Sequence, residues 1–562
     1  MMAAGGPFLR DHQTNQGAHA LVHALQGAGV RCIFSLSGNQ IMPVYDALLD
    51  SGIRLVHVRH EAAAVYMAEA YAQLTGEIGV ALVTAGAGFG NALGALISAR
   101  ASETPVLLLS GDSPRNQDGM GAFQEMDQVA MAQPVTKLAR RASTADRLPS
   151  ELATAIATAL SGRPGPVHLA LPADVLTAPL TAPAHSALAL TYGEQALTNA
   201  DAERLVTFLN GAAHPVVLTG PALARTRTGD ALAQLQSTLN VPVICMESPR
   251  GLRDPSLGAL IDLTRTADRI LLLGKSADFT TGFLGKDMGT PDARFAVVDP
   301  EAPEIERARA RIGGQLDIAC QGDALPALRK LIAQAADVPD RADWLAHSAQ
   351  ALALRAEVPS ATASGPDTLH AAQVGAAVAA QLAKSPGAVL VVDGGEFGQW
   401  MQAIHHDGPR VINGVSGAIG AAPAYAIAAS IACPDVPVIA AMGDGTAGFL
   451  LAEYETAARE EARFVAVIGN DHVWNAEHQI QIREFGPDRT YGCALSPMAR
   501  YDLAAQALGG FGVFVNTNST AALAEALDHA QKSRKPACVN VRICPAPAPV
   551  VQGNTPPAGS AH

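Results

Sequence analysis

The hydrophobic residues of this chain fall into short runs separated by longer stretches rich in Ala and Leu. Most runs are continuous rather than alternating, which is typical of strands buried on both faces of a parallel sheet. Stretches of helical length, such as residues 200–210 and 453–461, lie between the runs. The pattern predicts an α/β protein built from doubly wound parallel sheets covered by helices. The apolar runs lie at residues 80–84, 105–110, 167–171, 215–219, 241–246, 270–273, 295–298, 389–392, 438–442 and 464–468.

Two segments with little pattern divide the chain. Residues 176–198 carry several Pro and Ala residues, and residues 338–366 are rich in Ser, Ala and Pro around a helical patch at 344–355. Three domains of ordinary size are therefore expected, followed by a Pro/Gly/Ala-rich tail or lid. The predicted domains are residues 1–185, 195–340 and 365–545, and the tail is residues 546–562.

Composition narrows the class of protein. Of the 562 residues, 49% are hydrophobic and 16% are charged, and the formal net charge is −13. A chain this acidic is a poor nucleic-acid binder, because phosphate contacts need clustered Lys and Arg. The uncharged stretch at 415–433 is rich in Gly and Ala, so we expect a buried helix there and no membrane span. The seven cysteines lack a CxxC pair and the N-terminus lacks a long apolar region, which favours a cytoplasmic protein without a signal peptide.

Acidic residues follow two successive predicted strands of the third domain. One strand leads into Gly-Asp-Gly-Thr at 443–446, and the next leads into Gly-Asn-Asp at 469–471. One strand–helix–strand unit separates Asp444 from Asp471, so both carboxylates should reach the sheet edge where open α/β sheets bind ligands. Carboxylates suit a hard ion such as Mg²⁺, and glycines before a helix N-terminus suit a phosphate. The sequence predicts a metal–diphosphate site, although Gly-Asp-Gly alone is more often a structural turn.

The paired segments resemble the thiamin diphosphate signature. The chain as a whole resembles the acetolactate synthase-like superfamily, which includes benzaldehyde lyase and 2-hydroxyacyl-CoA lyase. Further matches are Arg-His-Glu-Ala-Ala at 59–63, Thr-Ala-Gly-Ala-Gly at 84–88 and Gly-Ala-Ile-Gly at 417–420. The resemblance implies that the metal is held by Asp444, Asp471 and the carbonyl of Val473. It implies cofactor contacts from Glu61, Asn91, Glu396, Phe397, Gly417, Ile419, Gly443, Asp444, Gly445, Thr446, Asp471 and Val473.

The resemblance also assigns roles within the site. Glu61 would exchange a proton with N1′ of the aminopyrimidine, and the Gly417 carbonyl would accept a hydrogen bond from the 4′-amino group. Ile419, which stands where the superfamily carries Met, would hold the cofactor bent. In this superfamily the glutamate of one subunit serves the metal site of another, so a homodimer or homotetramer is implied. Without the signature, Glu61 would be interpreted as a helix N-terminal charge and Ile419 as core.

The residues that would face the substrate are less specific. Gly-Ala-Phe-Gln-Glu at 121–125 resembles the acetolactate synthase segment that borders the substrate, which places Phe123 and Gln124 in the catalytic set. The segment at 127–132 is instead close to benzaldehyde lyase. An Asp at position 471 is also seen in the lyase-like branches.

Three further residues are candidates for substrate contact. Asn39 and Gln40 stand where acetolactate synthases carry Gly and Ala, and they would suit a polar or hydroxylated substrate. Arg250 would meet an anionic group, although a solvated turn residue is the simpler interpretation.

The leading hypothesis is a thiamin diphosphate- and Mg²⁺-dependent enzyme that decarboxylates and ligates 2-oxo acids, as acetolactate synthase does. The alternatives are a 2-hydroxyacyl-CoA lyase, an acyloin or benzaldehyde lyase, and a cyclic diketone hydrolase. Asp444, Asp471 and Glu61 argue against a catalytically inactive binding subunit, and the lack of GxGxxG argues against a dinucleotide oxidoreductase.

The central domain carries no recognisable nucleotide motif. Gly-Lys-Ser at 274–276 is no P-loop, because the required glycine is replaced by Arg269. Relatives carry FAD, ADP or no nucleotide in the central domain, and the sequence leaves these three open.

Overall fold

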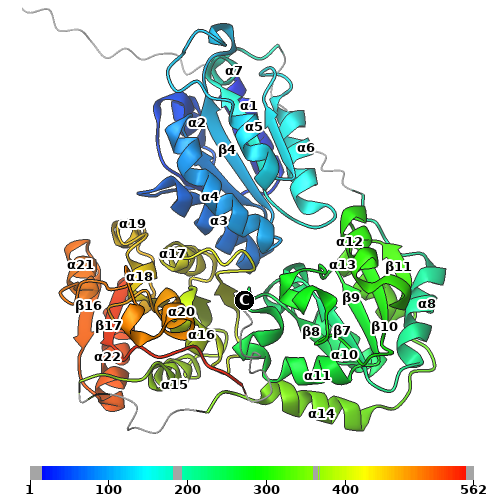
Figure 1. The fold of residues 1–562 in the computed structure, drawn as a ribbon. Helices are drawn as coiled ribbons and strands as arrows, with labels where there is room; N and C mark the ends of the chain where they lie inside the picture. The colour runs from blue at the N-terminus through cyan, green and yellow to red at the C-terminus, as the bar shows by residue number, and fades with distance from the viewer. Residues whose placement is uncertain (1–14, 182–192, 358–364, 366, 552–562) are drawn as a thin grey trace, which may run out of the picture.

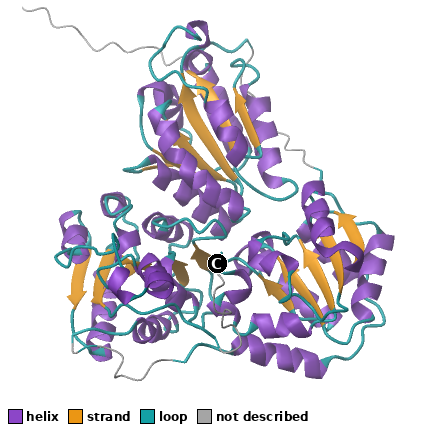
Figure 2. Ribbon diagram, viewed as in Figure 1, coloured by secondary structure: helices purple, strands orange, loops and turns teal. Residues whose placement is uncertain are grey.

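The computed structural model describes residues 15–181, 193–357, 365 and 367–551. Figure 1 shows three units around a common centre, and in each a parallel sheet is covered by helices on both faces (Figure 2). The predicted fold class is therefore confirmed. No helix in these described ranges is both long and apolar enough to cross a membrane.

The first unit is built on a six-stranded sheet in the order β2-β1-β3-β4-β6-β5. Its strands are β1 (Cys32–Ser35), β2 (Arg54–His57), β3 (Gly79–Val83), β4 (Val106–Asp112), β5 (Leu138–Arg141) and β6 (Val167–Pro172). Its helices are α1 (Gly17–Gly27), α2 (Met42–Leu48), α3 (Glu61–Thr75), α4 (Ala87–Ala101), α5 (Gln128–Ala132), α6 (Leu148–Leu160) and α7 (Ala173–Thr177).

The central unit has a five-stranded sheet in the order β11-β10-β9-β7-β8. Its strands are β7 (Pro215–Thr219), β8 (Val243–Cys245), β9 (Arg269–Leu273), β10 (Arg294–Asp299) and β11 (Leu316–Gln321). Its helices are α8 (Asn199–Asn210), α9 (Arg225–Thr228), α10 (Ala231–Leu239), α11 (Leu260–Thr266), α12 (Ala302–Ile312), α13 (Ala324–Ala333) and α14 (Ala342–Ala353).

The third unit repeats the architecture of the first, with a six-stranded sheet in the order β13-β12-β14-β15-β17-β16. Its strands are β12 (Val389–Val392), β13 (Arg410–Ile412), β14 (Val438–Gly443), β15 (Val465–Asn470), β16 (Phe511–Val515) and β17 (Ala537–Arg542). Its helices are α15 (Ala371–Leu382), α16 (Gly395–Gln402), α17 (Ala422–Ala432), α18 (Asp444–Ala447), α19 (Glu453–Arg459), α20 (Asn475–Phe485), α21 (Tyr501–Ala507) and α22 (Thr520–Ser533).

The first and third units share one hydrophobic core, because α3 packs directly against α17 (Figure 1). A polar contact fixes this packing at its centre. The hydroxyl of Tyr425 donates to Oε2 of Glu69 at 2.9 Å, and both side chains are buried. Burial raises the pKa of Glu69, while hydrogen bonds from Ser102, Tyr425 and Ser98 favour its ionised form. Such satisfied buried groups specify how two helices register against each other.

Two expectations about boundaries change. The helix expected inside the second linker is α14, which belongs to the central unit, because Trp344, Ser348 and Ala351 form one buried face. The indole N–H of Trp344 donates to the Pro215 carbonyl at 2.9 Å, so the central unit extends beyond residue 340. The helix expected over 415–433 begins only at Ala422, and the residues before it form a loop.

The predicted tail is packed where it is described. The indole N–H of Trp400 donates to the Pro547 carbonyl at 2.9 Å, and Val551 is buried with Ala259 and Ala351 of the central unit. Residues 552–562 of that prediction, and residues 182–192 of the first linker, lie outside the described residues.

Candidate active site

The two predicted metal ligands lie side by side at the carboxyl edge of the third sheet. Strands β12 and β14 are neighbours whose crossovers lead to opposite sides, which makes their carboxyl ends the ligand-binding crevice of an open sheet. Asp444 follows β14 directly, and Asp471 follows the adjacent β15. Gly443 and Gly469 are paired across these strands, so the two acidic residues leave the sheet near each other.

Backbone hydrogen bonds hold both carboxylates. Oδ2 of Asp444 accepts the His472 N–H at 2.9 Å, and Oδ1 accepts the Gly445 N–H at 3.0 Å. Oδ1 of Asp471 accepts the Val473 N–H at 3.2 Å. The Thr446 hydroxyl donates to the Gly443 carbonyl at 3.0 Å and closes the turn. The helix expected after this turn is only the single turn of α18, so the phosphate would meet turn amides more than a helix dipole.

The charge distribution at this edge suits a cation. Burial raises the pKa of Asp444 to about 6, and burial together with the charge of Asp444 raises the pKa of Asp471 to about 7. The charge of Asp444 therefore disfavours ionisation of Asp471 unless a positive charge lies between them. No group of three or more His, Cys, Asp or Glu side chains within the described ranges suits a metal. Two carboxylates and the Val473 carbonyl instead fit Mg²⁺, which takes its other ligands from phosphate and water.

A buried aspartate that the motifs did not identify shapes the Gly417–Gly420 loop. Asp393, which follows β12, accepts backbone N–H groups from Gly394 at 2.7 Å, Gly420 at 3.0 Å and Ala422 at 3.0 Å. Gly394 also lies so close to Ile419 that a Cβ on it would be 2.8 Å from Cγ2 of that side chain. The loop that would contact the cofactor is therefore fixed to the sheet by one carboxylate. An acidic residue directly after a predicted strand is the signal that would have indicated it.

Replacing Asp393 with alanine should lower the free energy of unfolding by about 1–3 kcal/mol, because three N–H groups lose a buried acceptor. Urea denaturation of the protein without cofactor measures this change. Asp435→Ala, at an exposed position, is the matched control and should leave the transition in place. An unchanged Asp393→Ala transition would contradict the assignment.

Glu396, Phe397 and Arg250 also gather near this edge. The ring of Phe397 packs directly on Gly469 and leaves no room for a Cβ there. Burial raises the pKa of Glu396, and the charge of Arg250 opposes that shift. The guanidinium of Arg250 forms no hydrogen bond or ion pair with any residue in the described part of the chain, and its loop reaches Gly417 through Pro249. Arg250 is thus a half-buried cation facing this edge from the central unit.

The second cluster lies in the first unit, around the start of α3. Glu61 is the first residue of this helix, and His60 caps the helix by accepting the Ala62 N–H at 3.1 Å. Oε2 of Glu61 accepts a hydrogen bond from Nδ2 of Asn91 at 3.0 Å, and the side chain is buried. A Cβ on Gly88 would lie 3.2 Å from Oε1, so the glycine allows α4 to approach the carboxylate.

A chain of hydrogen bonds extends this cluster. The Thr84 hydroxyl donates to Oε1 of Gln40 at 2.6 Å, and Nε2 of Gln40 donates to Oε1 of Gln124 at 2.9 Å. The predicted pair Asn39 and Gln40 is therefore divided, because Gln40 is buried in this chain while Asn39 is exposed. Phe123 is also exposed, with 72% of its surface accessible.

No hydrogen bond or ion pair between described residues joins the Glu61 cluster to the Asp444 cluster. Hydrogen bonds among the described residues thus connect predicted residues within each unit, and none of them connects the two sets.

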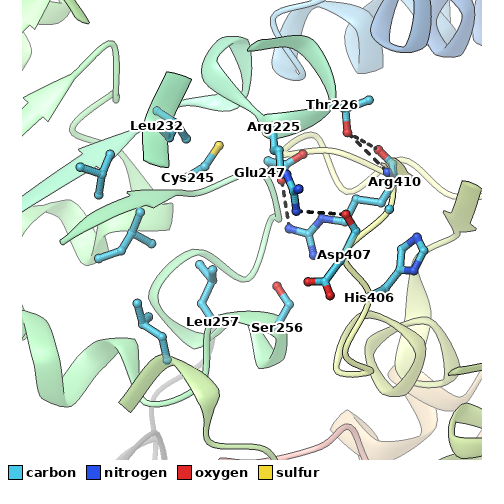
Figure 3. A pocket seen from close by; sticks show the side chains of 14 residues that line it. Arg225, Thr226, Leu232, Cys245, Glu247, Ser256, Leu257, His406, Asp407 and Arg410 are labelled. Carbon is cyan, nitrogen blue, oxygen red and sulfur yellow. Dashed lines mark hydrogen bonds and ion pairs between the residues drawn. The ribbon is translucent and has the colours of Figure 1, made fainter. Parts of the chain in front are cut away.

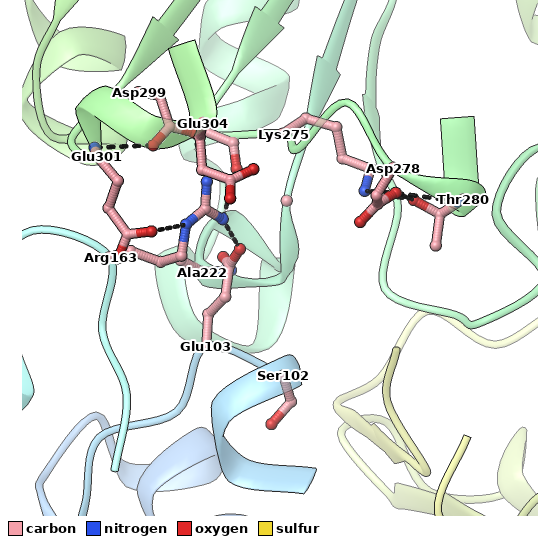
Figure 4. A network of polar contacts seen from close by, with 12 residues as sticks. Ser102, Glu103, Arg163, Ala222, Lys275, Asp278, Thr280, Asp299, Glu301 and Glu304 are labelled. Carbon is pink, nitrogen blue, oxygen red and sulfur yellow. Dashed lines mark hydrogen bonds and ion pairs between the residues drawn. The ribbon is translucent and has the colours of Figure 1, made fainter. Parts of the chain in front are cut away.

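Two side chains of the first unit, Glu103 and Arg163, contact residues at or just after the ends of strands of the central sheet (Figure 4). Glu103 accepts the Ala222 N–H at 2.8 Å, and Arg163 donates to the Gly274 carbonyl at 3.2 Å. Arg163 also bridges Glu103 and Asp299. Lys275 is buried and donates to the Thr280 hydroxyl, consistent with the absence of a P-loop. FAD, ADP and no nucleotide in the central unit stay open alternatives.

A separate cavity of about 270 Å³ lies between the central and third units (Figure 3). Arg410 pairs with Glu247 at 3.0 Å on its wall, and Arg225 donates to the Asp407 carbonyl at 3.0 Å. His406 also lines it.

Comparison with known proteins agrees with this geometry. Residues 15–131 match the thiamine pyrophosphate enzyme N-terminal TPP binding domain, and residues 393–541 match the C-terminal TPP binding domain of the same family. The chain belongs to the thiamine pyrophosphate enzyme family and is a thiamin diphosphate-dependent enzyme.

Its relatives carry two kinds of name. A probable acetolactate synthase of Mycobacterium bovis is 30% identical over 95% of this chain and 97% of its own length. The 2-hydroxyacyl-CoA lyase 2 of Homo sapiens is 29% identical over 94% of this chain and 90% of its own length. The acetolactate synthase isozyme 1 large subunit of Escherichia coli is 29% identical over 86% of each chain.

Proposed function

We propose that the protein is a Mg²⁺- and thiamin diphosphate-dependent carboligase that decarboxylates a 2-oxo acid and joins the product to a second carbonyl. The observation that carries the proposal is the adjacent pair Asp444 and Asp471 in a chain whose other TPP-binding domain presents a buried glutamate, Glu61, hydrogen-bonded by Asn91. When bound, thiamin diphosphate supplies the nucleophilic carbon that makes or breaks a bond next to a carbonyl.

The residues of this chain supply binding, orientation and proton transfer. Asp444, Asp471 and the Val473 carbonyl would hold the metal, which would offset the charge of the diphosphate. The Gly417 carbonyl would accept a hydrogen bond from the 4′-amino group, and Ile419, whose side chain lies against Gly394, would contact the cofactor. Glu61 would exchange a proton at pyrimidine N1′.

Glu61 acts at the site of a second copy of the chain, so the working unit is a homodimer or a pair of such dimers. Two observations support this arrangement: the Glu61 and Asp444 clusters share no hydrogen bond or ion pair among the residues described, and large apolar side chains are exposed in both units that carry them. These exposed side chains include Met120 and Phe123 in the first unit, and Phe449, Phe485 and Tyr491 in the third.

A second candidate function is cleavage of a 2-hydroxyacyl-CoA. An aspartate at position 471 and the similarity to 2-hydroxyacyl-CoA lyases favour it. The buried Gln40–Gln124 pair suits a substrate with hydroxyl or carbonyl oxygens in either case.

A screen of the holoenzyme against pyruvate, 2-hydroxyacyl-CoAs, benzoin and cyclic diketones, recording CO₂ and aldehyde release, separates the candidates. Release of CO₂ from a 2-oxo acid with formation of a ligated product supports the carboligase, and aldehyde release from the acyl-CoA alone refutes it.

Gln40→Ala should change the ratio of kcat/KM values between substrates by about tenfold, which corresponds to the loss of one or two hydrogen bonds. Its affinity for thiamin diphosphate should stay within about threefold of wild type, because Gln40 contacts Gln124 and Thr84 rather than the Glu61 carboxylate. Competition assays with paired substrates measure the ratio. An equal loss for every substrate tested would contradict the role in specificity.

A further inference from the structure

The segment that leads into Glu61 is held by α19 of the third unit. Oε1 of Glu453 accepts the backbone N–H of Arg59 at 3.0 Å, and the N–H of His60 faces the same carboxylate. Two further contacts join the same two segments: Arg54 donates to Glu460 at 3.0 Å, and Arg459 donates to the His57 carbonyl. Residues 54–60 are thus attached to one helix at several points.

Glu453 differs from the other contacts in this group because it is buried. Only 1% of its surface is accessible, whereas the side chains of Arg54 and Arg59 are 46% and 54% accessible. Exposed ion pairs contribute little, since water and salt screen them. The second oxygen of Glu453 accepts the Thr456 hydroxyl at 2.7 Å, so both of its carboxylate oxygens are hydrogen-bonded. A buried, satisfied carboxylate of this kind is costly to move.

Glu453 lies close in the chain to the predicted metal site. It is the first residue of α19, the helix that follows α18 and the Asp444 turn. On the other side of the contact, Arg59 and His60 immediately precede Glu61, which is the first residue of α3. The direction in which the Glu61 side chain leaves the helix depends on where that helix begins.

We propose that Glu453 is a positioning residue for Glu61: by accepting the Arg59 N–H, it fixes the first turn of α3 and the direction of the proton-exchanging carboxylate. This inference rests on the proposed role of Glu61. A displacement of about 1 Å at a reacting group can cost about 100-fold in rate, so a contact two residues away is enough to matter.

The first test needs no cofactor. Backbone hydrogen–deuterium exchange is followed by mass spectrometry in the peptide that contains residues 57–62, for wild type and for Glu453→Ala, Glu453→Asp and Glu453→Gln. Exchange in this peptide should rise at least about tenfold in the alanine and aspartate variants, because Arg59 loses its acceptor. Glutamine should behave as wild type, because its amide oxygen can accept from Arg59 while its NH₂ donates to Thr456. Glu461→Gln, an exposed change just beyond α19, is the matched control.

The second test measures the consequence for the bound cofactor. The holoenzyme variants are transferred to D₂O, and the loss of the C2 proton of thiamin diphosphate is followed by NMR after acid quench. Glu453→Asp should slow this exchange by about tenfold or more while the Kd for thiamin diphosphate stays within about threefold, and Glu453→Gln should restore the wild-type rate. If Glu453→Ala does not fold, the comparison of Glu453→Asp with Glu453→Gln still tests the positioning role.

The outcomes separate this inference from the proposed function. Wild-type exchange at residues 57–62 and at C2 in Glu453→Asp would overturn the positioning role and leave the function intact. Glu453→Gln keeps an oxygen that can accept the Arg59 N–H. If this variant were as impaired as Glu453→Asp, the positioning role would also be overturned. Failure of the wild-type protein to bind thiamin diphosphate would instead refute the proposed function.

Discussion

Glutamine in place of Glu61 should lower kcat by about 10²–10⁴-fold, the range that general acid–base groups contribute. Glutamine keeps the size of the side chain and an oxygen that Asn91 can donate to, so the packing against Gly88 should persist. It cannot exchange a proton, so only the activation of the cofactor is lost. Steady-state kinetics measure kcat, and equilibrium titration should give a Kd for thiamin diphosphate within about threefold of wild type.

The control for this variant is Glu203→Gln, at an exposed position on α8, which should retain wild-type turnover. Full activity of Glu61→Gln would remove the proposed mechanism. A loss of cofactor affinity as large as the loss of kcat would mean that Glu61 binds rather than activates.

The second large effect is expected at the metal site. Asp444→Asn should weaken Mg²⁺-dependent binding of thiamin diphosphate by more than about 100-fold, because it removes the charge of the more buried of the two carboxylates and places an NH₂ against one of the two backbone N–H groups that this side chain accepts. The asparagine oxygen can still accept the His472 N–H, and the Thr446 hydroxyl still donates to the Gly443 carbonyl, so the turn should remain folded. Trp474 packs on Gly445 in the same turn, so tryptophan fluorescence offers a readout of the titration.

Asp471→Asn provides the matched comparison. The hydrogen bond to Asp471 comes from one backbone N–H, that of Val473, so an amide at position 471 can keep its oxygen toward that N–H and the metal without placing its NH₂ against a second N–H group. This variant should therefore lose about tenfold or less in affinity. Equal affinities for wild type and Asp444→Asn would contradict the metal site, and so would a larger loss in Asp471→Asn than in Asp444→Asn.

The sequence pattern predicted the interior strands well, because strands buried on both faces must be continuously apolar. It predicted the edge strands poorly. The edge strands that it missed are β2, β5, β11, β13 and β16, and each contains exposed or half-buried positions. The edge strand β8 was predicted by the apolar run at 241–246. Two interior strands were also missed. β1 is a fully buried run of only four residues. In β17 the buried Asn540, which hydrogen-bonds to Asn470 and Asp502, interrupts the apolar run.

The candidate site was predictable as far as chain topology determines it. The carboxyl ends of parallel neighbours must share an edge, so two acids one strand–helix–strand unit apart had to approach each other. The same rule would have placed Asp393, which follows β12, at this edge, but it could not have predicted the hydrogen-bonding roles of Asp393 and Glu453. Each acts through hydrogen bonds to backbone N–H groups far away in sequence, such as Ala422 for Asp393 and Arg59 for Glu453. Backbone groups carry no sequence signal of their own.

The central claim is that Asp444 and Asp471 hold a magnesium ion through which thiamin diphosphate binds. Calorimetric titration of the metal-free protein with thiamin diphosphate, with and without Mg²⁺, tests this claim most directly. We expect saturable binding with Mg²⁺, at one cofactor per chain, and binding at least about 100-fold weaker after the metal is chelated. Binding of equal strength in the presence and absence of Mg²⁺, or no binding in either case, would contradict it.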